Sequence, residues 1–400
     1  MPGYEVIGEE EQREILDVLS RKALFRYEFH EQRQGIYKVE EFEREFARYC
    51  EVNHALAVSS GTAAFRVALS ALGIGPGDEV ITQGFTFVAT WEAILDAGAI
   101  PVFAEIDNTL CLTPHDLAKK VSPRTKAIMP VHMCGSQARI EEIMRIADER
   151  GIPVIEDTAQ ACGGKLNGKA LGSFGKIGTF SFDSVKTMTT GEGGMVITND
   201  RDSYIRASEY HDHGHDHSPH VGRGLEKRNF IGFNCRMMEL QGALGLAQLK
   251  KLDSMILEPQ RENKSRIKRA LGKIDQVTFR SVPDPKGDTA TFLIFFLPTQ
   301  EKAKEFSKVM AQEGCPTVYW YDNTWHYYER WEHLLEGKSL LPTGYPFKTE
   351  SGELRCGFDA SSLPETAKIL SRCLTIPINI DMEEQLPKIE RAIEKAAQVL

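Results

Sequence analysis

Seven short apolar runs recur between residues 55 and 198 of the chain. Most of the gaps between them have the periodicity of amphipathic helices, as at Ala89–Asp96 and Ile140–Arg150. Strands that alternate with helices are joined by crossovers and form a parallel sheet covered on both faces. The sequence therefore predicts an α/β fold with a mostly parallel seven-stranded sheet. The expected strands are Ala55–Val58, Glu79–Thr82, Ile100–Ala104, Ala127–Val131, Pro153–Glu156, Ile177–Phe182 and Met195–Thr198.

A second, smaller α/β domain is expected in the C-terminal part of the chain. A length of 400 residues suits a large and a small domain that share a cleft. We place the large domain, with the N-terminal segment, at residues 1–255 and the small domain at residues 256–400. A helix near Met237–Leu257 leads into the small domain. The strands expected there are Val277–Arg280, Thr291–Leu297 and Leu374–Pro377, and the last helix is expected at Met382–Leu400.

Charge and cysteine usage narrow the class of protein. The net charge of −9 disfavours binding to nucleic acid or to anionic membranes. The eight cysteines follow neither a C-x-x-C pattern nor a disulfide framework, which is typical of reduced thiols. No run is apolar and long enough for a spanning helix, and the first residues lack the features of a signal peptide. These features predict a cytoplasmic protein that acts on small molecules. We also expect no metal site.

One lysine, Lys186, stands where a strand gives way to a Gly-rich turn. A lysine normally lies on a solvated face, whereas one flanked by hydroxyl groups and glycines at a strand end is positioned for chemistry. Its amine can form a Schiff base with the aldehyde of pyridoxal 5′-phosphate (PLP). From this segment alone, a surface lysine in a Gly-rich hairpin remains the alternative.

Two acids, Glu156 and Asp157, end the apolar run that precedes this segment. α/β sheets bind ligands beyond the carboxyl ends of their strands. A PLP enzyme needs a carboxylate there to pair with the protonated pyridine nitrogen. We predict this role for Asp157, with Gln160 within reach of the 3-oxygen of the ring. The alternative is that both acids are solvated at a strand end.

A turn of small residues, Ser59-Ser-Gly-Thr62, joins an apolar run to a helical pattern. Free N–H groups at a helix N-terminus bind phosphate. We expect backbone amides of Thr62 and Ala63 to do so, with help from the Thr62 hydroxyl. The turn is not a P-loop, because no Gly-Lys-Ser/Thr follows.

Taken together and in this order, these motifs resemble the DegT/DnrJ/EryC1/StrS family of sugar aminotransferases, which have PLP-dependent transferase fold type I. The resemblance runs along nearly the whole chain. It implies PLP as cofactor, with Lys186 as the Schiff-base lysine and Asp157 at the pyridine nitrogen. It further implies a homodimer with shared active sites, because Asn234 matches an asparagine that reaches the phosphate of the neighbouring subunit. The remaining residues implied to bind the cofactor are Thr62, Ala63 and Ser181 at the phosphate, Phe87 stacked on the ring and Gln160 at the 3-oxygen.

The resemblance also implies the reaction. Some relatives carry histidine at the lysine position and catalyse deoxygenation, whereas the lysine here favours transamination. The expected reaction moves an amino group from L-glutamate to a keto-sugar, with Lys186 as the proton shuttle. A non-catalytic PLP-binding regulator remains the alternative of another class, since fold alone does not fix function.

A histidine-rich stretch, His211–His220, has three interpretations. It can be a mobile polar loop for substrate, a plain solvated loop or an adventitious metal binder. The basic residues Arg223, Lys227 and Arg228 follow at once. They can hold a carboxylate or phosphate of the substrate, or form an ordinary exposed patch.

The acceptor sugar has two candidates. Short stretches such as Phe25-Arg-Tyr27 and Met1-Pro-Gly3 are similar to a branch of the family that aminates 8-oxo-3-deoxy-manno-octulosonate, giving 8-amino-3,8-dideoxy-manno-octulosonate for lipopolysaccharide. This acid sugar would suit Arg26, His215 and Arg223 as substrate residues. The alternative acceptor is a nucleotide-linked keto-sugar of amino-sugar or antibiotic biosynthesis, since a few pocket residues change the sugar.

Overall fold

The computed structural model describes residues 2–218, 220–349 and 351–400. Met1 of the Met1-Pro-Gly3 opening and Pro219 of the histidine-rich stretch lie outside the described residues, as does Glu350. In the part of the chain that is described, all eight cysteines are free thiols. No helix among these residues is both long and apolar enough to cross a membrane.

The predicted seven-stranded sheet is present, in the order β3-β2-β4-β5-β8-β9-β1. Two parallel bridges, Ile128 to Val154 and Val131 to Asp157, join the three-stranded part to the four-stranded part. All neighbours pair in parallel except those of β9, which runs against β8 and β1. The strands are β1 (His54–Val58), β2 (Glu79–Gln83), β3 (Ile100–Ala104), β4 (Thr125–Ile128), β5 (Ile155–Asp157), β8 (Ile177–Ser181) and β9 (Gly194–Thr198).

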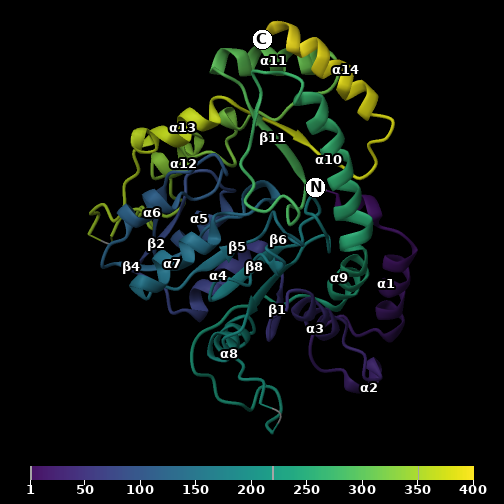
Figure 1. Ribbon diagram of the computed structural model, residues 1–400. Coiled ribbons are helices and arrows are strands. Elements are labelled where there is room, and N and C mark those ends of the chain that lie inside the picture. Colours follow the sequence, from purple (N-terminus) through teal and green to yellow (C-terminus); the bar gives the residue numbers. More distant parts are fainter. Residues whose placement is uncertain (1, 219, 350) are drawn as a thin grey trace.

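Helices cover both faces of this sheet (Figure 1). The apolar faces of α4 and α5 pack on one face around Val58, Val80 and Ile155. On the other face, α3 and α9 pack around the rings of Phe42, Phe46, Phe180 and Phe182, which are all buried. Because the central strands are buried on both faces, they read as continuous apolar runs in the sequence. These helices are α3 (Lys38–Tyr49), α4 (Gly61–Ala71), α5 (Ala89–Asp96), α6 (Pro114–Lys120), α7 (Ile140–Arg150), α8 (Arg201–Tyr210) and α9 (Glu239–Lys251).

The helix expected at Met237–Leu257 differs from the prediction. It is α9, and it continues through a π-helical stretch, Leu252–Leu257, directly into α10 (Glu258–Leu271). Pro259 has no N–H and its ring would clash with the carbonyl four residues earlier in a regular helix. The wider π-helical turn lies at this point, so the helix does not end there.

A three-stranded antiparallel sheet, β10-β11-β12, forms the core of the C-terminal region, above the large sheet in Figure 1. Successive residues of β11 point to opposite faces. Leu293 and Phe295 pack into the core between this sheet and α10, α11 and α14, whereas Ile294 and Phe296 pack into the core that contains Phe103 and Trp331. The boundary at residue 255 remains a prediction. The elements are β10 (Thr278–Phe279), β11 (Phe292–Phe296), β12 (Cys373–Pro377), α11 (Gln300–Gln312), α12 (Glu332–Leu335), α13 (Pro364–Leu370) and α14 (Leu386–Ala396).

Short elements complete the chain. The N-terminal segment carries helices that pack beside α9, and a small hairpin follows β5. These elements are the 3₁₀ turn Gly3–Val6, α1 (Glu9–Arg21), α2 (His30–Arg33), β6 (Lys165–Leu166) and β7 (Lys169–Ala170).

Candidate functional site

A cavity of about 270 Å³ lies where β5 and β8 end and α4 begins. Six of the residues singled out from the sequence line it: Thr62, Phe87, Asp157, Gln160, Ser181 and Lys186. Their functional roles stay predictions. Residues from the C-terminal region close the cavity, namely Phe292, Trp320 and His326.

Lys186 projects from the loop between β8 and β9. Its backbone is fixed on both sides, because its N–H donates to Asp183 O (3.0 Å) and its carbonyl accepts the N–H of Gly3 (3.0 Å). The amine Nζ lies 5.8 Å from the centre of the Phe87 ring. Burial lowers the pKa of this amine, and the nearby carboxylates of Asp183 and Asp157 only partly oppose the shift. More of the lysine is therefore neutral, and nucleophilic, than on a solvated face.

Asp157 is buried at the end of β5 and held by two donors. The Thr90 hydroxyl donates to Oδ2 (2.8 Å), and the Ala159 N–H donates to Oδ1 (3.0 Å). Burial raises the pKa of this carboxyl, and the bonds from Ala159 and Thr90 oppose the rise. A cation brought against it would restore the ionised form.

Glu156, the neighbouring acid, stabilises the fold and does not line the cavity. Its carboxylate faces away from the cavity and accepts the backbone N–H groups of Gly172, Phe174 and Gly175 (2.6–2.9 Å). It also contacts His132 Nε2 (2.9 Å). Because His132 Nδ1 accepts the N–H of Ala138 (3.1 Å), Nε2 carries the proton and donates it. The alternative that both acids are solvated is wrong, since Glu156 and Asp157 are both buried.

Gln160 presents its amide nitrogen to the cavity. Its Oε1 accepts the backbone N–H of Cys134 (2.9 Å), which fixes the orientation of the side chain. The NH₂ group can therefore donate to an oxygen of a ligand. This fits the predicted contact with the 3-oxygen.

The N-terminus of α4 has one backbone amide that is already bonded and two that are open. The Ala63 N–H, expected to bind phosphate, donates to the side chain of the helix cap, Ser60 Oγ (3.0 Å). Phosphate binding by Ala63 stays a prediction. The N–H groups of Gly61 and Thr62 have no partner among the described residues and remain open for an anion. A Cβ on Gly61 would lie 2.7 Å from Ser181 Cβ, so a glycine is needed for this approach.

An aromatic segment that we did not select from the sequence forms the opposite wall. The loop of Phe87 pairs with it through Val88 N to Trp325 O and Thr86 N to His326 O, both 3.0 Å. The rings of Phe87 and Trp325 are parallel within 3°, with centres 5.7 Å apart. The aromatic density of Tyr319–Tyr328 in the sequence was the available signal.

The three predicted substrate residues lie elsewhere in this chain. Arg26 pairs with Glu43 (2.6 Å), Arg223 pairs with Asp212 (2.7 Å), and His215 contacts Glu226. Arg26 and Arg223 line a separate cavity of about 1030 Å³ near the histidine-rich stretch. Their charges are already neutralised by acids of this chain, which disfavours a carboxylate ligand there.

The histidine-rich stretch is anchored rather than freely solvated. His211, Asp212 and His215 are buried, so the interpretation as a plain solvated loop is wrong for them. Asp212 accepts from both Arg223 and Arg236, which hold the pKa of its carboxyl well below the usual range. In the described part of the chain, no group of three or more His, Cys, Asp or Glu side chains is arranged to bind a metal ion. Asn234 is exposed and lies outside the Lys186 cavity.

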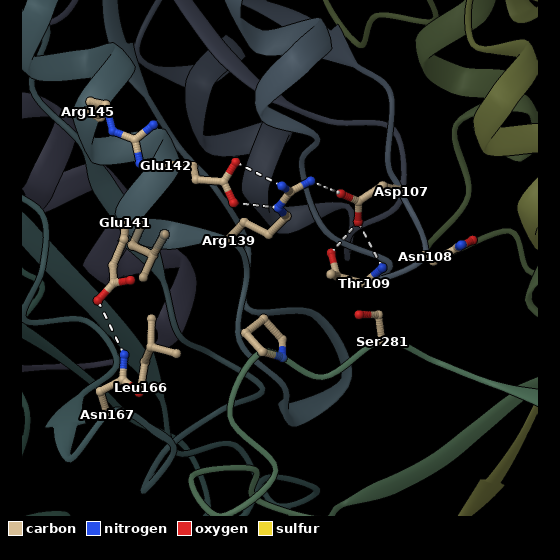
Figure 2. Close-up of a pocket in the computed structure, with 12 residues that line it drawn as sticks. Asp107, Asn108, Thr109, Arg139, Glu141, Glu142, Arg145, Leu166, Asn167 and Ser281 are labelled. Carbon is tan, nitrogen blue, oxygen red and sulfur yellow. Dashed lines mark hydrogen bonds and ion pairs between the residues drawn. The ribbon is translucent and has the colours of Figure 1, made fainter.

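A further groove, of about 760 Å³, lies beside the N-terminus of α7 (Figure 2). Several of its polar groups bond to one another. Arg139 bonds to Glu142 (2.7 Å) and to Asp107 (3.4 Å), and Glu141 accepts from Asn167 (3.4 Å). Three acids and two arginines line the groove, so its charges nearly balance and give little attraction for a ligand.

The parallel sheet, the buried lysine, the facing carboxylate and the open helix N-terminus together define the class of fold-type I transferases. Within that class, residues 7–344 match the profile of the DegT/DnrJ/EryC1/StrS aminotransferase family. The chain belongs to this family.

Curated relatives carry several activities. GDP-perosamine synthase of Escherichia coli O157:H7 is 43% identical over 224 residues, or 54% of this chain and 59% of that protein. The chain thus spans under two thirds of the length of this relative, as it does of the synthases of Vibrio cholerae and Caulobacter vibrioides. The pleiotropic regulatory protein of Geobacillus stearothermophilus is 31% identical over 364 residues, covering 90% of this chain and 88% of that protein.

Solved structures support the fold over the whole chain. The crystal structure of 3-amino-5-hydroxybenzoic acid synthase has a TM-score of 0.80 at 29% identity and covers 98% of this chain and 97% of that one. An aminotransferase of Psychrobacter cryohalolentis has a TM-score of 0.81 at 26% identity, with 98% of both chains covered.

Proposed function

We propose that this chain is a PLP-dependent aminotransferase that moves an amino group from L-glutamate to a keto-sugar. The observation that carries the proposal is the cavity in which Lys186, with a lowered pKa, and Asp157, with a raised pKa, are enclosed together. Perturbed ionisable pairs of this kind mark functional sites.

The residues of the cavity fit the cofactor. Asp157 would hold the pyridine nitrogen, because a cation there satisfies a carboxylate that burial disfavours. Gly61 and Thr62 N–H groups, with Ser181 beside them, would hold the phosphate. Gln160 would donate to the ring oxygen, and Phe87 would cover one face of the ring. PLP supplies a carbonyl for the lysine and an electron sink for the α-carbon of the amino donor.

Some residues of the cavity would transfer protons, and others would keep water out of it. Lys186, once free of the cofactor, would take the α-proton of the donor and deliver it to the former aldehyde carbon of the cofactor, which needs an amine that is neutral at working pH. Asp157 keeps a positive charge on the ring nitrogen in place. Trp320 and Phe292 exclude water from the apolar side of the cavity.

Two acceptors stay open within this proposal. The relatives named GDP-perosamine synthase favour a nucleotide-linked keto-sugar. The finer proposal from the sequence is 8-oxo-3-deoxy-manno-octulosonate, with Arg26, His215 and Arg223 as substrate residues. Their ion pairs with Glu43, Glu226 and Asp212 would have to open for this role.

The proposed active unit is a homodimer in which Asn234 reaches the phosphate site of the other subunit. Support comes from the surface around it, since Leu225, Ile231 and Phe233 are 81%, 85% and 57% exposed. Large exposed apolar side chains that gather in one segment mark an interface.

A second candidate function, a PLP-binding regulator without turnover, is favoured by one observation. The pleiotropic regulatory protein of Geobacillus stearothermophilus matches this chain along 88% of its own length.

The test is an absorbance spectrum of the purified protein with PLP, before and after L-glutamate. A visible band of lysine-bound cofactor that gives way to a band near roughly 330 nm, where the aminated cofactor absorbs, supports an aminotransferase. Recovery of the visible band with a nucleotide-linked keto-sugar or with the acid sugar then decides the acceptor. A bound but inert cofactor supports the regulator, and no visible band with PLP contradicts both.

A further inference from the structure

His326 enters the cavity from the C-terminal region and is not needed for any role assigned above. It lines the same cavity as Lys186. Its ring packs against Trp320, with centres 4.9 Å apart, and against Phe87, with centres 5.3 Å apart. These two aromatic rings fix the plane of the imidazole.

The hydrogen bonds around Asn323 determine where the His326 proton lies. Asn323 Oδ1 accepts the backbone N–H of Trp325 (2.9 Å), and a backbone N–H can only donate, so this atom is the amide oxygen. The same Oδ1 lies 3.0 Å from His326 Nδ1. Nδ1 must therefore carry a hydrogen and donate it. A neutral ring then has an unprotonated Nε2, which is an acceptor.

The ring is neutral under ordinary conditions. Burial, and next the nearby Lys186 amine, lower the pKa of His326 to about 3. His326 and the Lys186 amine lie against the same ring, because the His326 ring centre is 5.3 Å and Lys186 Nζ is 5.8 Å from the centre of the Phe87 ring. His326 therefore lies near the amine, where the substrate reacts.

We propose that His326 Nε2 is a substrate-binding acceptor that receives a hydrogen bond from a hydroxyl group of the amino acceptor. This inference rests on the proposed function and deepens it, because it makes a hydroxylated acceptor the preferred partner of the second half-reaction. L-Glutamate has no hydroxyl group beside its reacting carbon, so the first half-reaction does not use this contact. A buried acceptor left unpaired disfavours substrates that lack the hydroxyl.

Three substitutions separate the two nitrogens of the ring. His326→Asn places an amide near Nδ1 and keeps the bond to Asn323 but does not reach into the cavity. His326→Gln extends an amide oxygen toward the position of Nε2. His326→Phe keeps the ring packing on Trp320 and Phe87 and removes both nitrogens. Lys126→Ala, at an exposed position of β4, is the control.

Each half-reaction is measured separately by single-turnover absorbance. Two acceptors are tried, a GDP-linked 4-keto-sugar and 8-oxo-3-deoxy-manno-octulosonate. The variants are then measured with the acceptor that restores the visible absorbance band of the wild type faster. We expect His326→Phe and His326→Asn to lower the second-order rate of the acceptor half-reaction about tenfold, with the glutamate half-reaction within about twofold of wild type. His326→Gln should restore part of the loss.

The outcomes distinguish this inference from the proposed function. Equal losses in both half-reactions, or none, contradict a contact with the acceptor. Wild-type protein that reacts with glutamate but with neither sugar contradicts the hydroxylated acceptor and leaves the transaminase half-reaction in place. If glutamate also fails, the proposed function is wrong. His326 is then judged by calorimetric binding of GDP-mannose, for which equal affinity of wild type and His326→Phe overturns the contact.

Discussion

Lys186 and Asp157 are buried ionisable groups, and burial shifts their pKa values in opposite directions. Each shift favours the neutral form of the isolated group. A bound cofactor would compensate both groups, because its cationic ring nitrogen pairs with the carboxylate and its aldehyde carbon bonds to the amine. Cofactor binding would therefore offset the cost of burying the two groups.

Lys186→Ala tests the first group. Without the amine there is neither a covalent anchor nor a proton shuttle, so we expect turnover to fall by at least about 10³-fold while the fold persists. Circular dichroism checks the fold, and the coupled assay with glutamate checks turnover. Lys126→Ala serves as the control. Substantial activity of Lys186→Ala would contradict the assignment.

Asp157→Asn should lower activity and raise stability. The Thr86 and Thr90 hydroxyls bond to each other at 2.7 Å, so their hydrogens can reverse and Thr90 can accept from the new amide. We expect turnover to fall about 10²-fold, because the ring nitrogen loses its counter-charge.

The stability effect has a defined pH dependence. Burial raises the folded-state pKa of Asp157 above its unfolded value, so the wild type binds this proton more tightly when folded. The stability that the proton provides is present below about pH 4, the unfolded pKa, and is lost as the pH rises through the folded pKa. Urea unfolding of the protein without cofactor should therefore show that the free energy of unfolding of the asparagine variant increases relative to that of the wild type as the pH rises. A constant difference would contradict a raised pKa.

At the scale of elements, the start of α4 combines a helix cap with an anion site. Ser60 occupies the Ala63 N–H and leaves those of Gly61 and Thr62 open. We expect Gly61→Ala to weaken cofactor retention about tenfold or more and to cost about 1–3 kcal/mol of stability, because its Cβ would press on Ser181. Gly75→Ala, after α4, is the control, since the nearest atom to its Cβ lies at 3.8 Å. Unchanged PLP affinity of Gly61→Ala would remove α4 from the phosphate site.

The sequence was most informative for features that depend on a single short segment of the chain. The strands and α5 and α7 follow from apolar runs and helical periodicity, and Asp157 and Lys186 follow from their places at strand ends. The cap bond from the Ala63 N–H to Ser60 could not be predicted, because it depends on the Ser60 rotamer. His326 was missed because its meaning comes from packing against Phe87, more than two hundred residues earlier in the chain.

At the scale of the whole molecule, the proposed homodimer predicts complementation between two defective variants. Lys186→Ala and Asn234→Ala damage the same site from different subunits, so a mixed dimer has one site free of both changes. Refolding an equal mixture should restore up to about one quarter of wild-type activity, since half of the dimers are mixed and each has one good site.

The control for this experiment mixes each variant with itself. Light scattering gives the oligomeric state of every sample. No recovery in the mixed sample, or full activity of a monomer, would contradict shared active sites.

The two faces of β11 have a mechanical consequence. Leu293 and Phe295 belong to one core while Ile294 and Phe296 belong to another, so a single strand is common to both. A hinge motion that moved the C-terminal region away from the large sheet would disrupt the core that contains Ile294 and Phe296. We expect calorimetry to record one cooperative melting transition rather than two. Substrate would then enter by rearrangement of side chains such as that of Trp325, which is 59% exposed and stacks on Phe87, while the backbone stays in place.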